Sequence, residues 1–438
     1  MTVDRRHFMA HAAAGAAVTV PGLNFMAGLR SCAADLKKKN KSLIVLWMSG
    51  GPTTIDLWDM KPGTSTGGEH RPKPTAASGV QITEHLPNVA KQFKNLSIVR
   101  SLSTREGDHN RGTFMMNSGR SPSPLIDYPS IGSILAYYQG MDVEAMKNAD
   151  LPAFMSIGGP ASLPGFLGMK YAPFSIQNPG QPPENVSAPN GIEADRMVRR
   201  KALFDRVEGS LNTGAQMDAA RAHREVYEKA MNLVVSTRKE VFNLEKEIDG
   251  KPIDQKLKDD YGAGTGTGGS QFGRACLLAR KLVEAGTACV QIGLGGWDMH
   301  NNIFPTLANQ RLPVLDKGMG TLVRDLADRG KLKDTVIVWM GDFGRTPHIN
   351  TRGAKPGRDH YPRAWSATLW GGGIKGGRVV GKTDSEGANV VEGKVNAMDF
   401  LATICDVIGI DHTKQNEAGN GRPIRIVDKP QPFTKAIS

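Results

Sequence analysis

Short, uninterrupted apolar runs recur along the chain, and each is followed within two residues by glycine. The runs are 42–48 (SLIVLWM), 288–294 (ACVQIGL), 335–340 (TVIVWM) and 367–370 (ATLW). Strands that are buried on both faces of a parallel sheet give continuous apolar runs, whereas strands with one wet face alternate. The pattern therefore predicts four strands of a mostly parallel sheet.

Helical periodicity fills segments between these runs. One face is outlined by Leu312, Leu315, Met319, Leu322 and Leu326, whose spacing places them on one side of a helix. Residues 272–285 predict another helix, and residues 396–408 predict one that follows a capping asparagine and ends at a glycine. Strands that alternate with helices indicate an α/β class, a doubly wound mostly parallel sheet flanked by helices.

Composition shifts divide the chain. We expect an export signal over 1–34, a single α/β domain over 40–425 and a C-terminal tail over 426–438. Residues 151–270 are interpreted as inserted loops and helices. Within this insertion, 151–191 is rich in Pro, Gly, Ser and Asn and predicts surface loops, 215–248 is a charged helical stretch, and 261–270 is a glycine-rich linker.

The N-terminal segment has the order of a signal peptide. Arg5 and Arg6 form a twin-arginine pair, and an Ala/Gly-rich apolar stretch over 10–20 precedes small residues at 32–34. The alternative is an anchoring helix, but the stretch is shorter than the ~20 apolar residues that span a bilayer. We therefore expect export by the twin-arginine route to the periplasm or medium, and no integral membrane segment after signal removal.

Charge and cysteine content exclude several classes of function. Lys and Arg total 55 and Asp and Glu 43, so the formal net charge is +12, but the only tight basic run lies at 37–41. Nucleic-acid binders concentrate such charge in a patch, so we expect no nucleic-acid partner. The four cysteines show no C-x-x-C spacing, which gives no sign of a cysteine zinc site and leaves one disulfide open.

Polar residues able to do chemistry gather where the predicted strands end and in two further loops. Ligands of open α/β sheets bind beyond the carboxyl ends of the strands. Carboxylates and imidazoles in such places can hold metal ions, and arginines beside them suit phosphate or sulfate oxygens. The residues are Asp56, Asp298, His300, Asp342, Arg345, Asp359, His360, His109 and Arg111.

Each of these residues also has an ordinary structural interpretation. A single Asp after Gly often makes a turn or caps a helix, and His300 can hydrogen-bond within the fold. The hypothesis of a metal site depends on the grouping at three strand ends and two loops. Five other histidines lack that setting, namely His70, His85, His223, His348 and His412.

Several motifs carry a family resemblance. They are GGPTTIDLWDMKP from Gly50, FGRACLLARKLVEAG from Phe272, GGWDMH from Gly295, GDFGRTP from Gly341 and GRDHYP from Gly357. The chain resembles the domain of unknown function 1501 family of exported bacterial proteins, notably of planctomycetes, within the alkaline phosphatase and sulfatase superfamily. The resemblance implies an alkaline phosphatase-like fold and a two-metal hydrolase site.

Further segments are similar to pieces of sulfatases, with departures. Residues 86–89 resemble the start of the first helix, 111–120 the helix after the nucleophile, and 395–410 a late helix. Asp342 falls where sulfatases have the Asp of an Asp-His-Gly motif, but Phe343 stands in place of its His. By the same resemblance the slot of the usual Ser, Thr or Cys nucleophile falls near His109, and Asp56 lies several residues beyond the first strand and not directly after it.

The leading hypothesis is an exported metal-dependent hydrolase of phosphate or sulfate esters. Zinc, manganese, magnesium or calcium would be held by Asp56, Asp298, His300, Asp342 and His360, with Asp359 or His109 completing the shell. Arg111 and Arg345 would bind the anionic ester. The attacking group would be a metal-activated water or His109, with Thr113 as another candidate nucleophile. The alternative is a degenerate domain that binds sulfated or phosphorylated polysaccharide without cleaving it.

Overall fold

The computed structural model describes residues 41–139, 151–159, 164–183, 194–210, 230–234, 236–264, 270–417 and 423–437, together with positions 186, 224, 227 and 228. The predicted export signal, residues 215–223 and four further positions of the charged stretch 215–248, and the centre of the glycine-rich linker lie outside the described residues. None of the helices within those ranges is both long and apolar enough to cross a bilayer.

An eight-stranded sheet with strand order β12-β4-β11-β8-β1-β7-β5-β6 forms the centre of the domain. All four predicted strands are present in it, as β1, β7, β8 and β11. The pairs from β8 to β6 are parallel, whereas β11 runs antiparallel to both of its neighbours. The strands are β1 (Ser42–Met48), β4 (Leu96–Leu102), β5 (Phe154–Ile157), β6 (Phe174–Ile176), β7 (Cys289–Leu294), β8 (Thr335–Gly341), β11 (Trp365–Gly371) and β12 (Arg378–Val380).

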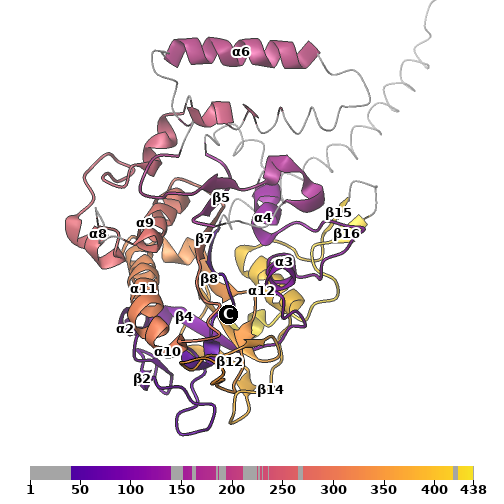
Figure 1. The fold of residues 1–438 in the computed structure, drawn as a ribbon. Coiled ribbons are helices and arrows are strands. Elements are labelled where there is room, and N and C mark those ends of the chain that lie inside the picture. Colours follow the sequence, from indigo (N-terminus) through magenta and orange to yellow (C-terminus); the bar gives the residue numbers. More distant parts are fainter. Residues whose placement is uncertain are drawn as a thin grey trace, which may run out of the picture. The chain divides into compact units, whose positions relative to one another are not determined.

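Helices cover both faces of the sheet, and β1 alternates between two hydrophobic cores. Ile44 and Leu46 belong to one core, together with α9 (Gln271–Glu284) and α11 (Leu312–Asp328). Leu43 and Val45 belong to the other, together with α3 (His109–Ser118), α4 (Ile131–Gln139) and α12 (Ala397–Ile408). Figure 1 shows α9 and α11 on one side of the strands and α3 and α12 on the other. The predicted doubly wound α/β fold is confirmed.

Helix ends follow the chemistry of their terminal residues. The Asn396 side chain accepts from the backbone N–H of Asp399, whose carboxylate accepts from the backbone N–H of Asn396, and Gly409 closes α12 in the left-handed conformation. Helices 272–285 and 396–408 are thus confirmed within one or two residues. The other α-helices of the described residues are α2 (Pro87–Lys91), α6 (Ala194–Ser210), α8 (Gln255–Tyr261), α10 (Ile303–Thr306) and α13 (Thr434–Ile437). Short strands outside the main sheet are β2 (Pro72–Pro74), β3 (Gln81–Thr83), β9 (Gly344–Arg345), β10 (His360–Tyr361), β13 (Lys382–Thr383), β14 (Val390–Glu392), β15 (Gln415–Glu417) and β16 (Pro423–Arg425).

The interpretation of 151–191 as surface loops is wrong at two places. β5 and β6 extend the main sheet from β7, and all four residues of β5 are buried. The run Phe154–Ile157 is only four residues long and sits between Pro- and Gly-rich stretches. Pairing with β7 therefore decides its structure against the local composition.

The C-terminal segment also differs from a free tail. Ile426, Val427 and Ile437 are buried in the core that includes α12, so the described residues after 425 pack on the domain. Cys276, Cys289 and Cys405 are buried and unbonded within the described residues.

The direction of β11 brings several loops to one edge of the sheet. β4, β1, β7 and β8 all run the same way, so their carboxyl ends share an edge. Because β11 is antiparallel to β8, the chain leaves and re-enters the sheet at that same edge without a crossover helix. The segment after β4 begins α3, and the connection from β8 to β11 holds residues 342–364. These segments carry most of the predicted chemistry.

Candidate metal centre

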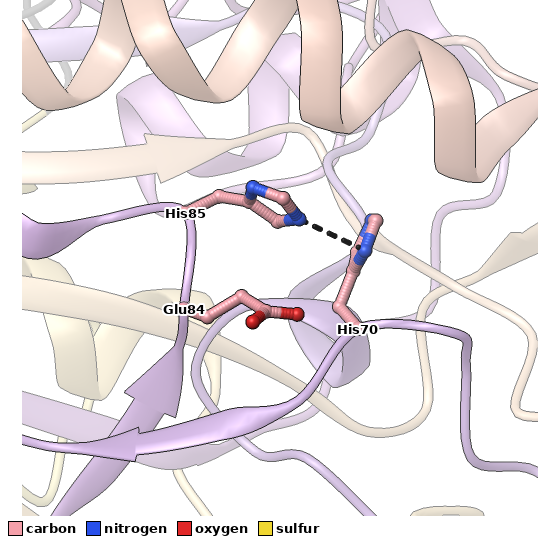
Figure 2. A group of neighbouring side chains, drawn as sticks. All are labelled: His70, Glu84 and His85. Carbon is pink, nitrogen blue, oxygen red and sulfur yellow. Dashed lines mark hydrogen bonds between the residues drawn. The ribbon is translucent and has the colours of Figure 1, made fainter.

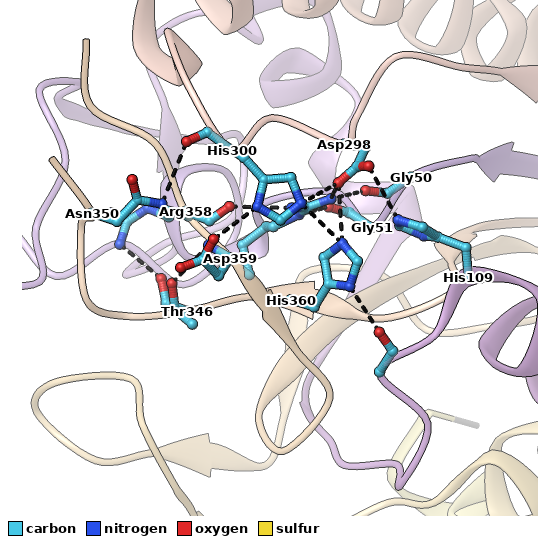
Figure 3. Close-up of polar contacts among 12 residues, drawn as sticks. Gly50, Gly51, His109, Asp298, His300, Thr346, Asn350, Arg358, Asp359 and His360 are labelled. Carbon is cyan, nitrogen blue, oxygen red and sulfur yellow. Dashed lines mark hydrogen bonds and ion pairs between the residues drawn. The ribbon is translucent and has the colours of Figure 1, made fainter. Parts of the chain in front are cut away.

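Three imidazoles converge on the carboxylate of Asp298 (Figure 3). The Nε2 atoms of His300 and His360 lie 2.9 Å and 3.1 Å from Oδ1 of Asp298, and Nε2 of His109 lies 3.3 Å from its Oδ2. His300 and His360 also approach each other, with 3.2 Å between their Nε2 atoms. The four residues come from the loop after β7, the start of α3, and β10. We call them the Asp298 cluster.

Each imidazole in the Asp298 cluster is held at its other ring nitrogen. Nδ1 of His109 lies 2.5 Å from Oδ2 of Asp342, and Nδ1 of His300 lies 2.8 Å from Oδ1 of Asp359. Nδ1 of His360 lies 2.8 Å from the carbonyl oxygen of Gly107. Acceptors at all three Nδ1 atoms favour the tautomer in which Nε2 carries a lone pair. This arrangement is typical of metal-binding histidines.

Arg345 fixes the position of Asp298. Its Nη2 lies 2.5 Å from Oδ1 of Asp298, its Nε donates to the carbonyl oxygen of Gly51, and its Nη2 also donates to that of Gly50. Gly50 is required at this point because a Cβ on it would lie 2.6 Å from the backbone nitrogen of Asp298. The strand end of β1 therefore supports the loop after β7. Arg345 is 2% exposed, so it orients Asp298 and is not open to an anionic ester as predicted.

Charges in the cluster shift two pKa values in opposite directions. Burial raises the pKa of Asp298, but the hydrogen bond and charge of Arg345, together with His360 and His109, outweigh it and hold the pKa well below the ordinary range. The hydrogen bond to Asp342 raises the pKa of His109, against partial burial, which lowers it. Asp298 is therefore anionic at neutral pH and able to face a cation.

Two buried atoms, one in the Asp298 cluster and one in the neighbouring Asp342, have no hydrogen-bond partner among the described residues. The two atoms are Nε2 of His109 and Oδ1 of Asp342. An unpaired buried polar atom costs about 1–3 kcal/mol. His109, Asp298 and His360 offer ligand atoms within 4.8 Å of one another. Tetrahedral ligands ~2.0–2.1 Å from zinc lie roughly 3.3 Å apart, which matches the distances around Asp298. The residues present thus fit a divalent metal ion.

Asp56 lies apart from the Asp298 cluster. Both of its oxygens accept from Arg358, over 2.8 Å each from Nε and Nη2, and Oδ2 also accepts from the hydroxyl of Thr53. Asp56 and Arg358 are 1% and 0% exposed. The carboxylate predicted as a metal ligand thus forms a buried bidentate ion pair.

No contact among the described residues links Arg111 or Thr113 to the Asp298 cluster. Arg111 was predicted to bind the substrate anion, but its guanidinium forms an ion pair with Glu106. Its Nε and Nη2 donate to the two carboxylate oxygens of Glu106 over 2.7 Å and 2.9 Å. Thr113 lies one turn after His109 in α3, half-buried. Asp342, His109, Asp359, His300 and His360 are brought together as the strand-end pattern indicates.

Arg352 is a residue that sequence reasoning missed. Its guanidinium pairs with Oδ2 of Asp359 while its side chain remains 73% exposed. It reaches the cluster through Asp359, and the side chains of Asp298 and His300 are themselves 46% and 41% exposed. Its position follows from a loop conformation, and no motif around it singles it out.

The family model described as "Protein of unknown function (DUF1501)" matches residues 40–437. No curated protein matches the chain. Among solved structures, the PsFucS1 sulfatase from Pseudoalteromonas sp. has a TM-score of 0.37 at 14% identity, covering 88% of this chain and 70% of that one. A TAB5 alkaline phosphatase mutant with Mg bound has 0.36 at 13%, covering 85% and 99%. The lipoteichoic acid synthase LtaP from Listeria monocytogenes has 0.33 at 11%, covering 89% and 75%. At these scores the likenesses carry no argument about function.

Proposed function

The chain belongs to the DUF1501 family, and from its site geometry we propose that it is a metal-dependent hydrolase of phosphate or sulfate esters. The observation that carries the proposal is the convergence of three Nε2 atoms on the Asp298 carboxylate. Two imidazoles and one carboxylate, from His109, His360 and Asp298, form a donor set that suits zinc with water in the fourth position, and manganese is a second candidate. The metal would be held by these three residues, with His300 beside them, where its Nε2 lies 3.4 Å from Nη1 of Arg345.

A bound divalent ion would supply Lewis acidity and lower the pKa of a coordinated water. The chain's own residues prepare that position. Asp342 and Asp359 hold the Nδ1–H groups of His109 and His300, so both rings keep a fixed orientation. Arg345 holds Asp298 against rotation through its contacts with two backbone carbonyls. Oδ1 of Asp342 is buried and has no hydrogen-bond partner among the residues that the structure describes, so this oxygen is available to a second cation.

For the substrate anion we propose Arg352 in place of Arg111 and Arg345. Its side chain is exposed and its Nη2 already pairs with one carboxylate oxygen of Asp359, and a guanidinium can hold two oxygens of a phosphate or sulfate group. The Arg352→Gln variant is expected to raise KM for an aryl ester several-fold with little change in kcat. Arg363→Gln, on an exposed arginine of the same connection, serves as the matched control.

The test combines metal analysis with turnover. The full chain is loaded with zinc, manganese, magnesium or calcium, analysed for bound metal, and assayed with aryl phosphate and aryl sulfate esters. Asp298→Asn is compared with Asp249→Asn, which alters an exposed carboxylate paired with Lys251. We expect metal-dependent turnover that Asp298→Asn reduces at least ~100-fold, because removal of metal-held groups usually costs that much or more.

Other results refute the proposal in different ways. Absence of bound metal in the wild-type chain would exclude the Asp298 cluster as a metal site. Bound metal with no turnover of either ester class would exclude the hydrolase. It would favour the alternative, a binding module for sulfated or phosphorylated polysaccharide, which immobilised polysaccharide can then test directly.

We further propose that the protein is exported by the twin-arginine route. The support is the Arg5-Arg6 pair and the short apolar stretch after it. Cell fractionation of the wild type and an Arg5→Lys/Arg6→Lys variant tests this proposal. Accumulation of the variant inside the cell is expected, and equal export of both proteins would contradict it.

A further inference from the structure

A second group of metal-ligand side chains lies on the β2–β3 hairpin (Figure 2). Nε2 of His85 lies 3.1 Å from Nδ1 of His70, and their rings meet edge to face at 4.5 Å. Glu84 contributes a carboxylate oxygen, so that one ligand atom from each residue lies within 4.8 Å of the others. The group shares no residue with the Asp298 cluster.

The hairpin register explains why these residues meet. β2 and β3 pair antiparallel with Pro72 opposite Thr83, and the backbone N–H of Glu84 donates to the carbonyl of Arg71. Continuing the register by two residues beyond the Pro72–Thr83 pair places His70 opposite His85. Directly opposed residues of antiparallel strands have Cβ atoms ~4.5–5.5 Å apart. The juxtaposition is therefore built into the hairpin and does not depend on a chance rotamer.

The two histidines are an unusual pair in the absence of a ligand. Nε2 of His70 is buried and has no hydrogen-bond partner among the described residues. Nδ1 of His70 faces Nε2 of His85, and a carboxylate oxygen of Glu84 lies beside them, so two imidazole nitrogens and one carboxylate oxygen are available to a single cation. A metal ion can replace the single proton that the two rings otherwise share.

We propose that His70, Glu84 and His85 form a second metal site, which binds zinc or a similar transition-metal ion. Two imidazoles and one glutamate are a ligand set used by zinc, with water in the remaining position. The N–N distance of 3.1 Å is close to the roughly 3.3 Å expected between tetrahedral ligands of zinc. Alkaline-earth ions are disfavoured because they prefer oxygen ligands.

The position of the hairpin gives this site a structural role. His70 packs edge to face on Phe304, with 5.7 Å between the ring centres, and the guanidinium of Arg358 also lies over the Phe304 ring, 5.8 Å from its centre. The carbonyl of Thr66, four residues before His70, accepts from Arg358. A metal ion that joins the two hairpin arms thus secures the segment that covers the buried pair of Asp56 and Arg358.

The experiment measures zinc binding by competition with a chromophoric chelator. It uses the full chain with the Asp298 cluster disabled by Asp298→Ala/His360→Ala. This background is expected to retain one zinc ion. Adding His85→Gln is expected to weaken that binding at least ~10-fold, whereas adding His348→Gln, on an exposed loop histidine, leaves it unchanged. Cobalt substitution provides a second readout, because its absorption bands report nitrogen ligation.

Folding is controlled with a milder variant. In Glu84→Gln the amide oxygen can still accept from the backbone N–H of Arg71, as the carboxylate does over 3.0 Å, so the hairpin is preserved while a charged ligand is lost. Circular dichroism without zinc should be the same in all variants. Zinc binding that is unaffected by both His85→Gln and Glu84→Gln overturns the proposal. The outcome is separate from that of the Asp298 cluster, whose failure would leave the zinc site on the hairpin intact.

Discussion

Replacement of Asp56 by asparagine tests the division between structural and chemical carboxylates. The Asp56 carboxylate is 1% exposed and receives two hydrogen bonds from the fully buried Arg358. Asparagine keeps the shape but removes the charge and turns one acceptor into a donor that faces the guanidinium. Breaking one side of a buried ion pair typically costs about 3–5 kcal/mol, because the other charge stays buried without compensation.

Urea unfolding of the metal-free protein measures this cost, and metal analysis of the folded variant completes the test. We expect the free energy of unfolding to fall by about 3–5 kcal/mol while the Asp298 cluster keeps its metal. A double variant, Asp56→Leu/Arg358→Met, should lose less than the sum of its single changes. Asp249→Asn serves as the exposed control and should leave the urea midpoint unchanged. A stable Asp56→Asn protein that no longer binds metal would refute the reasoning and restore Asp56 as a ligand.

Three further predictions concern other parts of the domain. Asp316→Ala removes a buried carboxylate that accepts from the first backbone N–H groups of α2, and urea unfolding should show a loss of about 2–3 kcal/mol; a loss below about 0.5 kcal/mol would contradict this role. Gly357→Ala would place a Cβ 1.9 Å from the backbone oxygen of His300, so zinc affinity of the Asp298 cluster should fall at least ~10-fold. Gly295→Ala, where a Cβ meets nothing within 4 Å, should bind zinc like the wild type, and equal affinities of both variants would disprove the prediction. Burial lowers the pKa of Lys281 to about 8, so the folded protein releases this proton at lower pH than the unfolded chain does. Stability relative to Lys281→Met should therefore rise from about pH 8 to pH 10.4, by up to about 3 kcal/mol, and a flat pH profile would rule out the buried charge.

The parts of the fold that were predictable are those where local pattern and tertiary environment agree. β1 and β8 are continuous apolar runs because both of their faces are buried. β4 was missed because serines and Arg100 interrupt its run, although six of its seven residues are buried. Its serines are accommodated in the sheet, where the hydroxyl of Ser97 donates to the carbonyl of Lys375. Such partners lie far away along the chain, so no local pattern reports them.

The residues of the candidate sites also divide into those that local sequence patterns predict and those that depend on distant partners. Asp298, His300 and Asp342 follow strand ends directly, and the general location of ligands in α/β sheets was enough to group them. Asp56 also follows a strand, but its partner Arg358 lies 302 positions away, so its role as an ion pair was hidden. His70 and His85 were set aside because neither follows a predicted strand. The signal available for them was a hairpin register, which required β2 and β3 to be recognised first.

The reversed direction of β11 has a consequence for how members of this family can diverge. A parallel neighbour would demand a crossover of fixed handedness and substantial length, so that changes there would disturb the layers on the sheet. The connection from β8 to β11 only has to leave and return at one edge, and the entropic cost of lengthening such a loop grows slowly. Evolution can therefore enlarge, shorten or recharge the rim that carries Arg352 while the strands beneath it stay as they are. Differences between family members in the molecules that they admit should therefore be concentrated in the connection from β8 to β11.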